Sequence, residues 1–225
     1  MKNTYGLVAD TAACLALLMG SGCLTTSSYH TARPVAPGTT EMGVAVEMQG
    51  SFAEEADGIL VTHPRVNVRR GLIPHADLGL SAGSHGTGLD FNYMLVDLDI
   101  MAFSINPSVG LQWQGIYGRD DSGPFGTDTS TNTNQTIWTP MLGLLADFAP
   151  AEILTITFGI KPGFVRFTES QGGSSNSESY NFLATSLGAR ISFSDFHLFP
   201  EFNLIKVFDD DIEDMSWTFG MGLGF

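Results

Sequence analysis

The chain closes on Trp217-Thr-Phe-Gly-Met-Gly-Leu-Gly-Phe225, and this stretch decides the fold class. Large apolar side chains occupy every second position, while threonine and glycine occupy the positions between them. Because successive side chains of a β-strand point to opposite faces, a period of two predicts a strand with one apolar face and one small or polar face. The apolar set consists of Trp217, Phe219, Met221, Leu223 and Phe225.

The same period of two runs back from this stretch to residue 41. In one segment, for example, Val109 and Leu111 alternate with Gly110 and Gln112. Ten such segments cover residues 42–52, 65–69, 77–83, 89–95, 103–114, 138–148, 154–164, 183–193, 198–204 and 217–225. We therefore expect one all-β domain of ten strands over residues 41–225.

The second face of these segments is mostly Gly, Ser, Thr and Asn, with single charges. Such a face is too small and too poor in Lys and Glu for a surface in water, but it suits a narrow, filled lumen. Turning a base such as Arg65 or Lys161 toward lipid would cost about 2–4 kcal/mol near the bilayer midplane. The apolar face of a membrane barrel must therefore point outward. The charged fraction of 15% is low beside an average of about 25%, as expected if the wall meets lipid.

The connections between the segments alternate in length. Those after the second, fourth, sixth and eighth segments are short, at residues 71–75, 97–99, 149–152 and 194–195. Those after the odd segments are generally longer, at residues 53–58, 84–88, 118–134, 168–178 and 207–214. Short turns on one side and long loops on the other are typical of a bacterial transmembrane barrel with both termini in the periplasm. The sequence predicts a ten-stranded antiparallel up-and-down transmembrane β-barrel.

In these features residues 41–225 resemble the small outer-membrane β-barrel proteins of Gram-negative bacteria. The closing stretch resembles the terminal strand, with its C-terminal Phe, that the barrel-assembly machinery recognises. The resemblance implies that Trp217, Phe219, Met221, Leu223 and Phe225 form an assembly signal. It also implies an outer-membrane location, with outer-membrane lipid and lipopolysaccharide as surroundings and the assembly machinery as a partner during insertion.

Residues 1–22 are expected to be an export signal. Lys2 precedes an apolar run over residues 12–19 that is too short to cross a bilayer as a helix, which needs about 20 residues. The stretch Gly-Ser-Gly-Cys over residues 20–23 resembles the lipobox of bacterial lipoproteins, which implies lipidation of Cys23; cleavage nearby by ordinary signal peptidase is the alternative. Leu24 after this cysteine resembles an outer-membrane address.

Residues 23–40 carry two prolines and no alternation, and we expect a flexible tether there, lipidated at its first residue. Cys14 and Cys23 are the two cysteines of the chain. If Cys14 leaves with the signal and Cys23 carries lipid, no disulfide can form.

The charge balance argues against nucleic acid as a partner. The chain has 24 acidic and 10 basic residues, a net charge of −14, and its bases are scattered rather than clustered. Contacts to phosphates need grouped Lys and Arg.

Two motifs resemble catalytic sites. Gly79-Leu-Ser-Ala-Gly83 fits the Gly-x-Ser-x-Gly elbow of α/β-hydrolases, but that motif needs a helix after the serine, so Ser81 is expected to be a strand residue facing the lumen. Asp97-Leu-Asp99 and Asp195-Phe-His197 have the spacings of the Asp-x-Asp and Asp-x-His pairs of the omptin family of outer-membrane proteases. Both pairs fall on predicted short turns, where Asp is common because its side chain bonds nearby backbone N–H groups.

No cofactor or metal site is predicted. An acidic cluster lies on the last loop, and carboxylates are ligands for calcium. The cluster consists of Asp209, Asp210, Asp211, Glu213 and Asp214. It lacks the spacing of an EF-hand, so a solvated loop is favoured, with divalent ions bridging it to lipopolysaccharide phosphates as the alternative. The five histidines, His30, His63, His75, His85 and His197, are dispersed, without the spacing of zinc or haem ligands.

The face assignment places nine charged residues in the lumen: Glu47, Asp77, Asp90, Asp147, Glu201, Arg65, Arg69, Lys161 and Arg190. Because buried charges must pair, a salt-bridged packed lumen is favoured over a narrow polar pore. The expected function is that of a non-enzymatic surface or envelope protein of the outer membrane. The alternatives are a narrow channel for ions or small polar solutes, and a rim enzyme such as an omptin-like protease. The sequence does not indicate a particular ligand or a particular oligomeric state.

Overall fold

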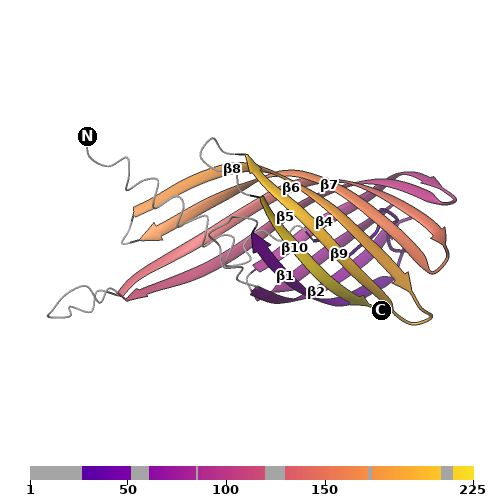
Figure 1. Ribbon diagram of the computed structural model, residues 1–225, viewed down its shortest axis with the longest axis horizontal. Helices are drawn as coiled ribbons and strands as arrows, with labels where there is room; N and C mark the ends of the chain where they lie inside the picture. The colour runs from indigo at the N-terminus through magenta and orange to yellow at the C-terminus, as the bar shows by residue number, and fades with distance from the viewer. Residues whose placement is uncertain (1–26, 52–60, 85, 120–129, 172–173, 209–214) are drawn as a thin grey trace.

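The computed structural model describes residues 27–51, 61–84, 86–119, 130–171, 174–208 and 215–225. Ten β-strands lie within these residues and close into one barrel (Figure 1). They are β1 (Thr40–Ser51), β2 (Val61–Ile73), β3 (Ala76–Gly83), β4 (Gly86–Leu98), β5 (Met101–Arg119), β6 (Ser130–Ala151), β7 (Leu154–Gln171), β8 (Ser174–Ser192), β9 (His197–Phe208) and β10 (Met215–Gly224). The described residues contain no helix long and apolar enough to cross a membrane.

Each strand pairs antiparallel with its neighbours in the sequence, and β1 closes the barrel against β10. The up-and-down barrel of ten strands is therefore confirmed. Each predicted segment lies inside one strand or runs one residue past its end. We call the end of the barrel where β1 begins and β10 finishes the base, and the opposite end the rim.

The connections at the base are short, as predicted, at residues 74–75, 99–100, 152–153 and 193–196. Two connections at the rim are shorter than predicted, because β5 pairs with β6 as far as Arg119 and Ser130, and β7 pairs with β8 as far as Gln171 and Ser174. The extensions of β6 and β8, residues 130–134 and 174–178, are rich in Ser, Thr and Asn at successive positions, so they show no alternation in hydropathy although their backbones continue the ladder. They reach past the other strands at the left of Figure 1.

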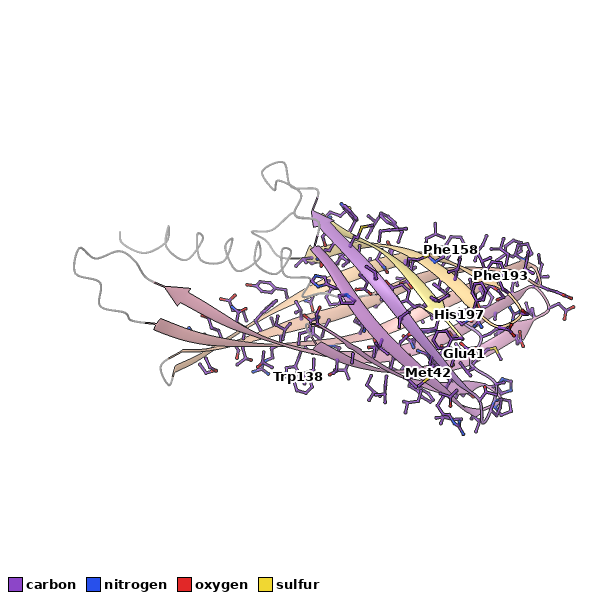
Figure 2. The ribbon with its side chains drawn as sticks, turned by 90° about the horizontal axis from the view of Figure 1, so that it is seen from below. Glu41, Met42, Trp138, Phe158, Phe193 and His197 are labelled. Atoms are coloured by element: carbon purple, nitrogen blue, oxygen red, sulfur yellow. The ribbon has the colours of Figure 1, made fainter. Side chains whose placement is uncertain are left out.

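The outer face of the wall is apolar. Every strand contributes at least one exposed large apolar side chain, and one from each is Val44, Val66, Leu80, Leu95, Phe103, Leu144, Phe158, Leu187, Phe202 and Met221. Met42, Trp138 and Phe158 are 52%, 48% and 54% exposed, and Figure 2 shows them among the side chains that line the wall. The outward orientation of the apolar face agrees with the sequence prediction.

The inner face is less polar than predicted on one side. Inward residues of β6 to β9 form a buried apolar cluster near the rim, which consists of Ile137, Val165, Phe182, Ala184, Ile205 and Val207. Met141, Phe167 and Tyr180 pack against it. The lumen therefore has an apolar side on β6–β9, where side chains fill the space.

Candidate functional site

We call residues 27–39, where the sequence predicts a flexible tether, the lumenal segment. Residues 27–35 lie inside the barrel, and residues 36–39 are exposed at its base. Tyr29, Ala32 and Val35 of this lumenal segment are buried, and so are Ser27, His30 and Thr31. An extended chain with no partner strand must bond its backbone groups to something else when it is buried. The inward side chains of the wall supply these partners, which is why the segment is held rather than free.

Three inward carboxylates accept hydrogen bonds from the backbone of the lumenal segment. Glu201 on β9 accepts from the N–H groups of Ser28, at 3.1 Å, and Tyr29, at 2.9 Å. Asp147 on β6 accepts from the N–H of Arg33 at 3.1 Å. Asp77 on β3 is fully buried and accepts from the N–H of Val35 at 2.7 Å. Hydrogen bonds to charged groups contribute about 1.5–3 kcal/mol each, so these contacts fix the path of the segment.

Inward amide and ammonium groups bind the same segment from other strands. The Asn92 amide on β4 donates to the carbonyl of Ala32 at 3.2 Å. The Lys161 ammonium on β7 donates to the hydroxyl of Ser28 at 2.7 Å. The segment is thus tied to β3, β4, β6, β7 and β9, on several sides of the lumen.

Tyr29 fits a socket made by glycines. Gly220 and Gly222 of β10 face its ring, and a Cβ on Gly220 would overlap the Tyr29 hydroxyl. Phe199 packs against the ring edge-on, with centroids 6.4 Å apart and planes at 84°. Tyr29 has a φ of +50°, an uncommon conformation for a residue with a side chain, which costs about 1–3 kcal/mol and persists only where the surroundings hold it. The socket and the Glu201 bond hold it here.

At the base the lumenal segment leaves the lumen past β2 and the β4–β5 turn. A Cβ on Gly71 would overlap the backbone of Ala36, so glycine is needed for the close approach of the two chains. The Arg33 guanidinium donates to the Asp97 carboxylate at 3.1 Å and to the carbonyl of Leu98 at 2.8 Å. These contacts close the base around the segment.

The structure brings the predicted lumen charges into pairs. Arg69 contacts both Asp77 and Asp90. Arg65 lies 3.5 Å from Glu47 and donates to the Ser81 hydroxyl at 2.6 Å. Lys161 lies 3.6 Å from Glu201. Asp147 accepts from the Thr157 hydroxyl at 2.8 Å in addition to its backbone contact.

Arg190, the last of the predicted charges, lies apart from the others at the base. It donates to the Glu41 carboxylate at 3.1 Å and to Nδ1 of His197 at 3.3 Å. Glu41 belongs to β1 and Arg190 to β8, two strands that do not pair, so this contact spans the base of the lumen; both Glu41 and His197 are labelled in Figure 2.

Three small cavities follow one another from the rim to the base; the wall residues of the first two come mainly from β2–β5, and those of the third come from β1, β2, β9 and β10. The rim cavity, about 50 Å³, is lined by residues that include His63, Arg65 and Gln112. The middle cavity, about 60 Å³, lies between the wall and Ser27–Tyr29. The base cavity, about 20 Å³, lies between Tyr29 and His197. Since a water molecule needs roughly 10–15 Å³ of such space, each cavity has room for a few waters at most.

The structure places the residues of the catalytic motifs on separate elements: Asp97 lies near the end of β4, and His197 begins β9. Ser81 lies in β3 with no helix after it, and its hydroxyl accepts from Arg65. Asp97 binds Arg33, and His197 accepts from Arg190. The described residues hold no cluster of three or more His, Cys, Asp or Glu able to bind a metal. The acidic loop over residues 209–214 and Cys23 lie outside the described residues.

Several residues of this site were missed from the sequence. Tyr29 and Val35 lie in a stretch without alternation, and their burial depends on partners distant in the chain. Asn92 is one of several polar residues on the inner face, and the alternation does not distinguish it from the others. One signal was available: Gly220 and Gly222 occupy consecutive inward positions in the closing stretch, and such a gap on an inner face leaves room for a buried group.

Comparison with known proteins gives structural neighbours and no close relative. No protein-family model matches the chain, and no curated protein matches it. Ail, the attachment invasion locus protein of Yersinia pestis, solved with the heparin analogue sucrose octasulfate, is 15% identical with a TM-score of 0.45, covering 84% of this chain and 99% of its own.

Two neisserial structures are similar at the same level. The translocator domain of the autotransporter NalP from Neisseria meningitidis is 12% identical with a TM-score of 0.47, covering 99% of this chain and 97% of its own. Neisserial surface protein A is 10% identical with a TM-score of 0.42, covering 82% and 95%. The neighbours of this chain are outer-membrane β-barrels of Gram-negative bacteria.

Proposed function

We propose that this chain spans the outer membrane of a Gram-negative cell as a ten-stranded barrel. Every strand carries exposed large apolar side chains on the outside, while ion pairs lie inside. A continuous apolar wall is a liability in water and a requirement in lipid. β1, β9 and β10 have 12, 12 and 10 residues, close to the roughly 9–11 that a tilted strand needs to cross the hydrocarbon layer.

The lumen of this barrel is closed, and the protein acts as a non-enzymatic surface or envelope protein. The observation that carries this proposal is the lumenal segment, whose backbone is bonded to Glu201, Asp147 and Asp77 within the barrel. The remaining cavities hold a few waters each, too little for a solute to pass.

Two measurements test the proposal. Membrane fractionation is expected to recover the protein in the envelope and to release it with detergent; recovery in the soluble periplasm without detergent would overturn the membrane assignment. Full-length protein in a planar bilayer is expected to give no stepwise current. Sustained steps from the unmodified chain would favour the narrow channel instead.

A rim enzyme is the remaining alternative, and a peptide library tests it. Asp97 accepts a hydrogen bond from Arg33, and Nδ1 of His197 accepts one from Arg190. Neither Asp97 nor His197 is therefore arranged to activate a water molecule. We expect no turnover. Peptide cleavage that disappears in His197→Ala would show that the omptin-like pairs are catalytic.

The two ends of the chain carry further parts of the proposal. Lipidation of Cys23 predicts a mature protein whose mass includes a diacylglyceryl group, whereas an unmodified N-terminus would indicate ordinary cleavage. The closing stretch keeps its alternation in the structure, with Ser216, Thr218, Gly220, Gly222 and Gly224 buried. Its apolar residues, Trp217, Phe219, Met221, Leu223 and Phe225, are proposed as the signal read by the barrel-assembly machinery, in contact with outer-membrane lipid and lipopolysaccharide afterwards.

A further inference from the structure

We infer that residues 27–39 are a removable gate, and that the lumen conducts small hydrophilic solutes when this segment leaves it. The inference rests on the proposed membrane barrel and adds an open state to the closed one. It follows from how the segment is attached, from what remains when it leaves, and from where the cavities lie.

The lumenal segment is not part of the wall. The ten strand pairings close the barrel among β1 to β10 alone. Among the described residues, ladder-like contact of the segment with a strand is confined to the base, where Gly38 donates to the carbonyl of Gly71 and Gly71 donates to that of Thr39. Removal of the segment therefore breaks no strand pairing.

The charges of the lumen other than Asp147 remain paired without the segment. Arg69 keeps Asp77 and Asp90, Arg65 keeps Glu47, and Lys161 keeps Glu201, all from the wall itself. Water can replace the backbone N–H donors that the carboxylates lose. Asp147 is the exception, because it loses the N–H of Arg33 and keeps only the Thr157 hydroxyl among its contacts, so water must hydrate it in the open state. An emptied lumen is consequently a hydrated polar channel in which the other charges keep their partners.

The docked state also contains the elements that a hinge needs. Gly38, the last residue but one of the segment, is the one glycine with a positive φ among the described residues, at +79°, and a Cβ built there would meet no atom within 4 Å. Tyr29 holds a strained backbone in the docked state, and release relaxes it. The segment can thus swing from its attachment at Thr40 through the base.

The cavities mark the path that opens. The rim and middle cavities both contact Arg65, and the middle and base cavities both contact Tyr29 and Arg69. Tyr29, a residue of the segment, separates the middle cavity from the base cavity. Loss of the segment removes Ser27, Ser28 and Tyr29 from the lining of the middle cavity and Tyr29 and His30 from that of the base cavity, which joins these two cavities. The lining of the rim cavity contains no residue of the segment, and Arg65, which lines both the rim and the middle cavity, is the constriction that a solute must still pass.

A reversible cross-link tests the gate in the full chain. A Cβ on Gly222 would lie 3.4 Å from Cγ of Tyr29. Because Cγ is one carbon–carbon bond, about 1.5 Å, from the Cβ of Tyr29, the two Cβ atoms would lie at most about 4.9 Å apart, and those of a disulfide lie about 3.5–4.5 Å apart. The variant combines Tyr29→Cys and Gly222→Cys with Cys14→Ser and Cys23→Ser. It is reconstituted into vesicles and planar bilayers, and its free thiols are counted before and after reduction.

The oxidised protein is expected to be silent, and the reduced protein, which lacks both the cross-link and the tyrosine anchor, to give stepwise currents. Tyr29→Cys alone, in the same cysteine-free background, should conduct with and without reductant, whereas Gly222→Cys alone should not respond to reductant. Reduced protein that co-floats with vesicles and has the circular dichroism of a barrel but passes no current would overturn the gate and leave the membrane barrel intact. Failure to co-float would overturn the membrane barrel itself.

Discussion

Replacement of Glu201 by glutamine separates the stability of the barrel from the docking of the lumenal segment. Glu201 accepts from two backbone N–H groups, of Ser28 and Tyr29, and lies 3.6 Å from the Lys161 ammonium. Glutamine keeps the shape and one acceptor oxygen but removes the charge and places an NH₂ donor beside other donors. We expect two effects of different size.

The first effect falls on the barrel. Lys161 is 3% exposed and would lose its carboxylate partner, and breaking a buried pair from one side costs about 3–5 kcal/mol. Urea unfolding of the vesicle-bound protein should lose about that much stability. Lys161→Met added to Glu201→Gln removes the buried ammonium and should recover most of the loss.

The second effect falls on the segment. Loss of charge-assisted bonds to two backbone N–H groups should weaken docking of the segment by about 1–3 kcal/mol. If the segment opens as a unit, hydrogen exchange of the Val35 amide should become roughly 5-fold to 150-fold faster. The Lys161→Met change should not reverse this. Glu178→Gln is the matched control, because Glu178 is exposed on β8 and bonds Tyr180 outside this site. Unchanged exchange at Val35 in Glu201→Gln would refute the reading that the carboxylate holds the segment.

Three further predictions concern the base, the wall and the closing strand. Gly71→Ala should expel the segment, because the Cβ of the alanine would overlap the backbone of Ala36, and the Val35 amide should then undergo free hydrogen exchange. Gly110→Ala is the control: its Cβ would lie 3.6 Å from the nearest atom, so hydrogen exchange at Val35 should be unchanged. Ile160→Arg should cost about 2–4 kcal/mol in vesicles if this outward residue lies near the bilayer midplane, whereas Ile160→Leu should cost under about 1.5 kcal/mol; equal unfolding midpoints would argue against lipid at this position. Deletion of Phe225 should reduce the assembled fraction in the envelope with little loss of stability in refolded protein, and normal assembly would exclude a signal role for this residue.

The wall of the barrel could be predicted because its pattern is local. The alternation over Trp217–Phe225 and nine earlier segments marked which side chains share a face, and the energetic cost of bases in lipid decided that the apolar face points outward. Strand ends were predicted less well where Ser, Thr and Asn occupy both faces, as in the rim ends of β6 and β8, because the ladder continues there without a change in hydropathy.

The contents of the lumen could be predicted only in part. The nine charged residues were placed inward by parity, but parity does not identify partners: Arg69 lies between Asp77 and Asp90, while Arg190 pairs with Glu41 across the base. The apolar cluster around Phe182 and Ile205 could not be predicted, because both faces of these strands are apolar near the rim. Successive apolar residues hide the period of two there.

By itself, the sequence determined the number of strands, their order and the face that each presents to its surroundings, since these follow from the spacing of side chains along one strand. The tertiary structure alone decided where residues 27–39 lie. Their path depends on Glu201, Asp147 and Asp77, of which Glu201 is 173 positions from Ser28, and on the gap above Gly220 and Gly222. A buried backbone must form hydrogen bonds with the polar groups that the closed barrel places beside it. These groups are distant in the sequence, so no local sequence pattern predicts the contacts.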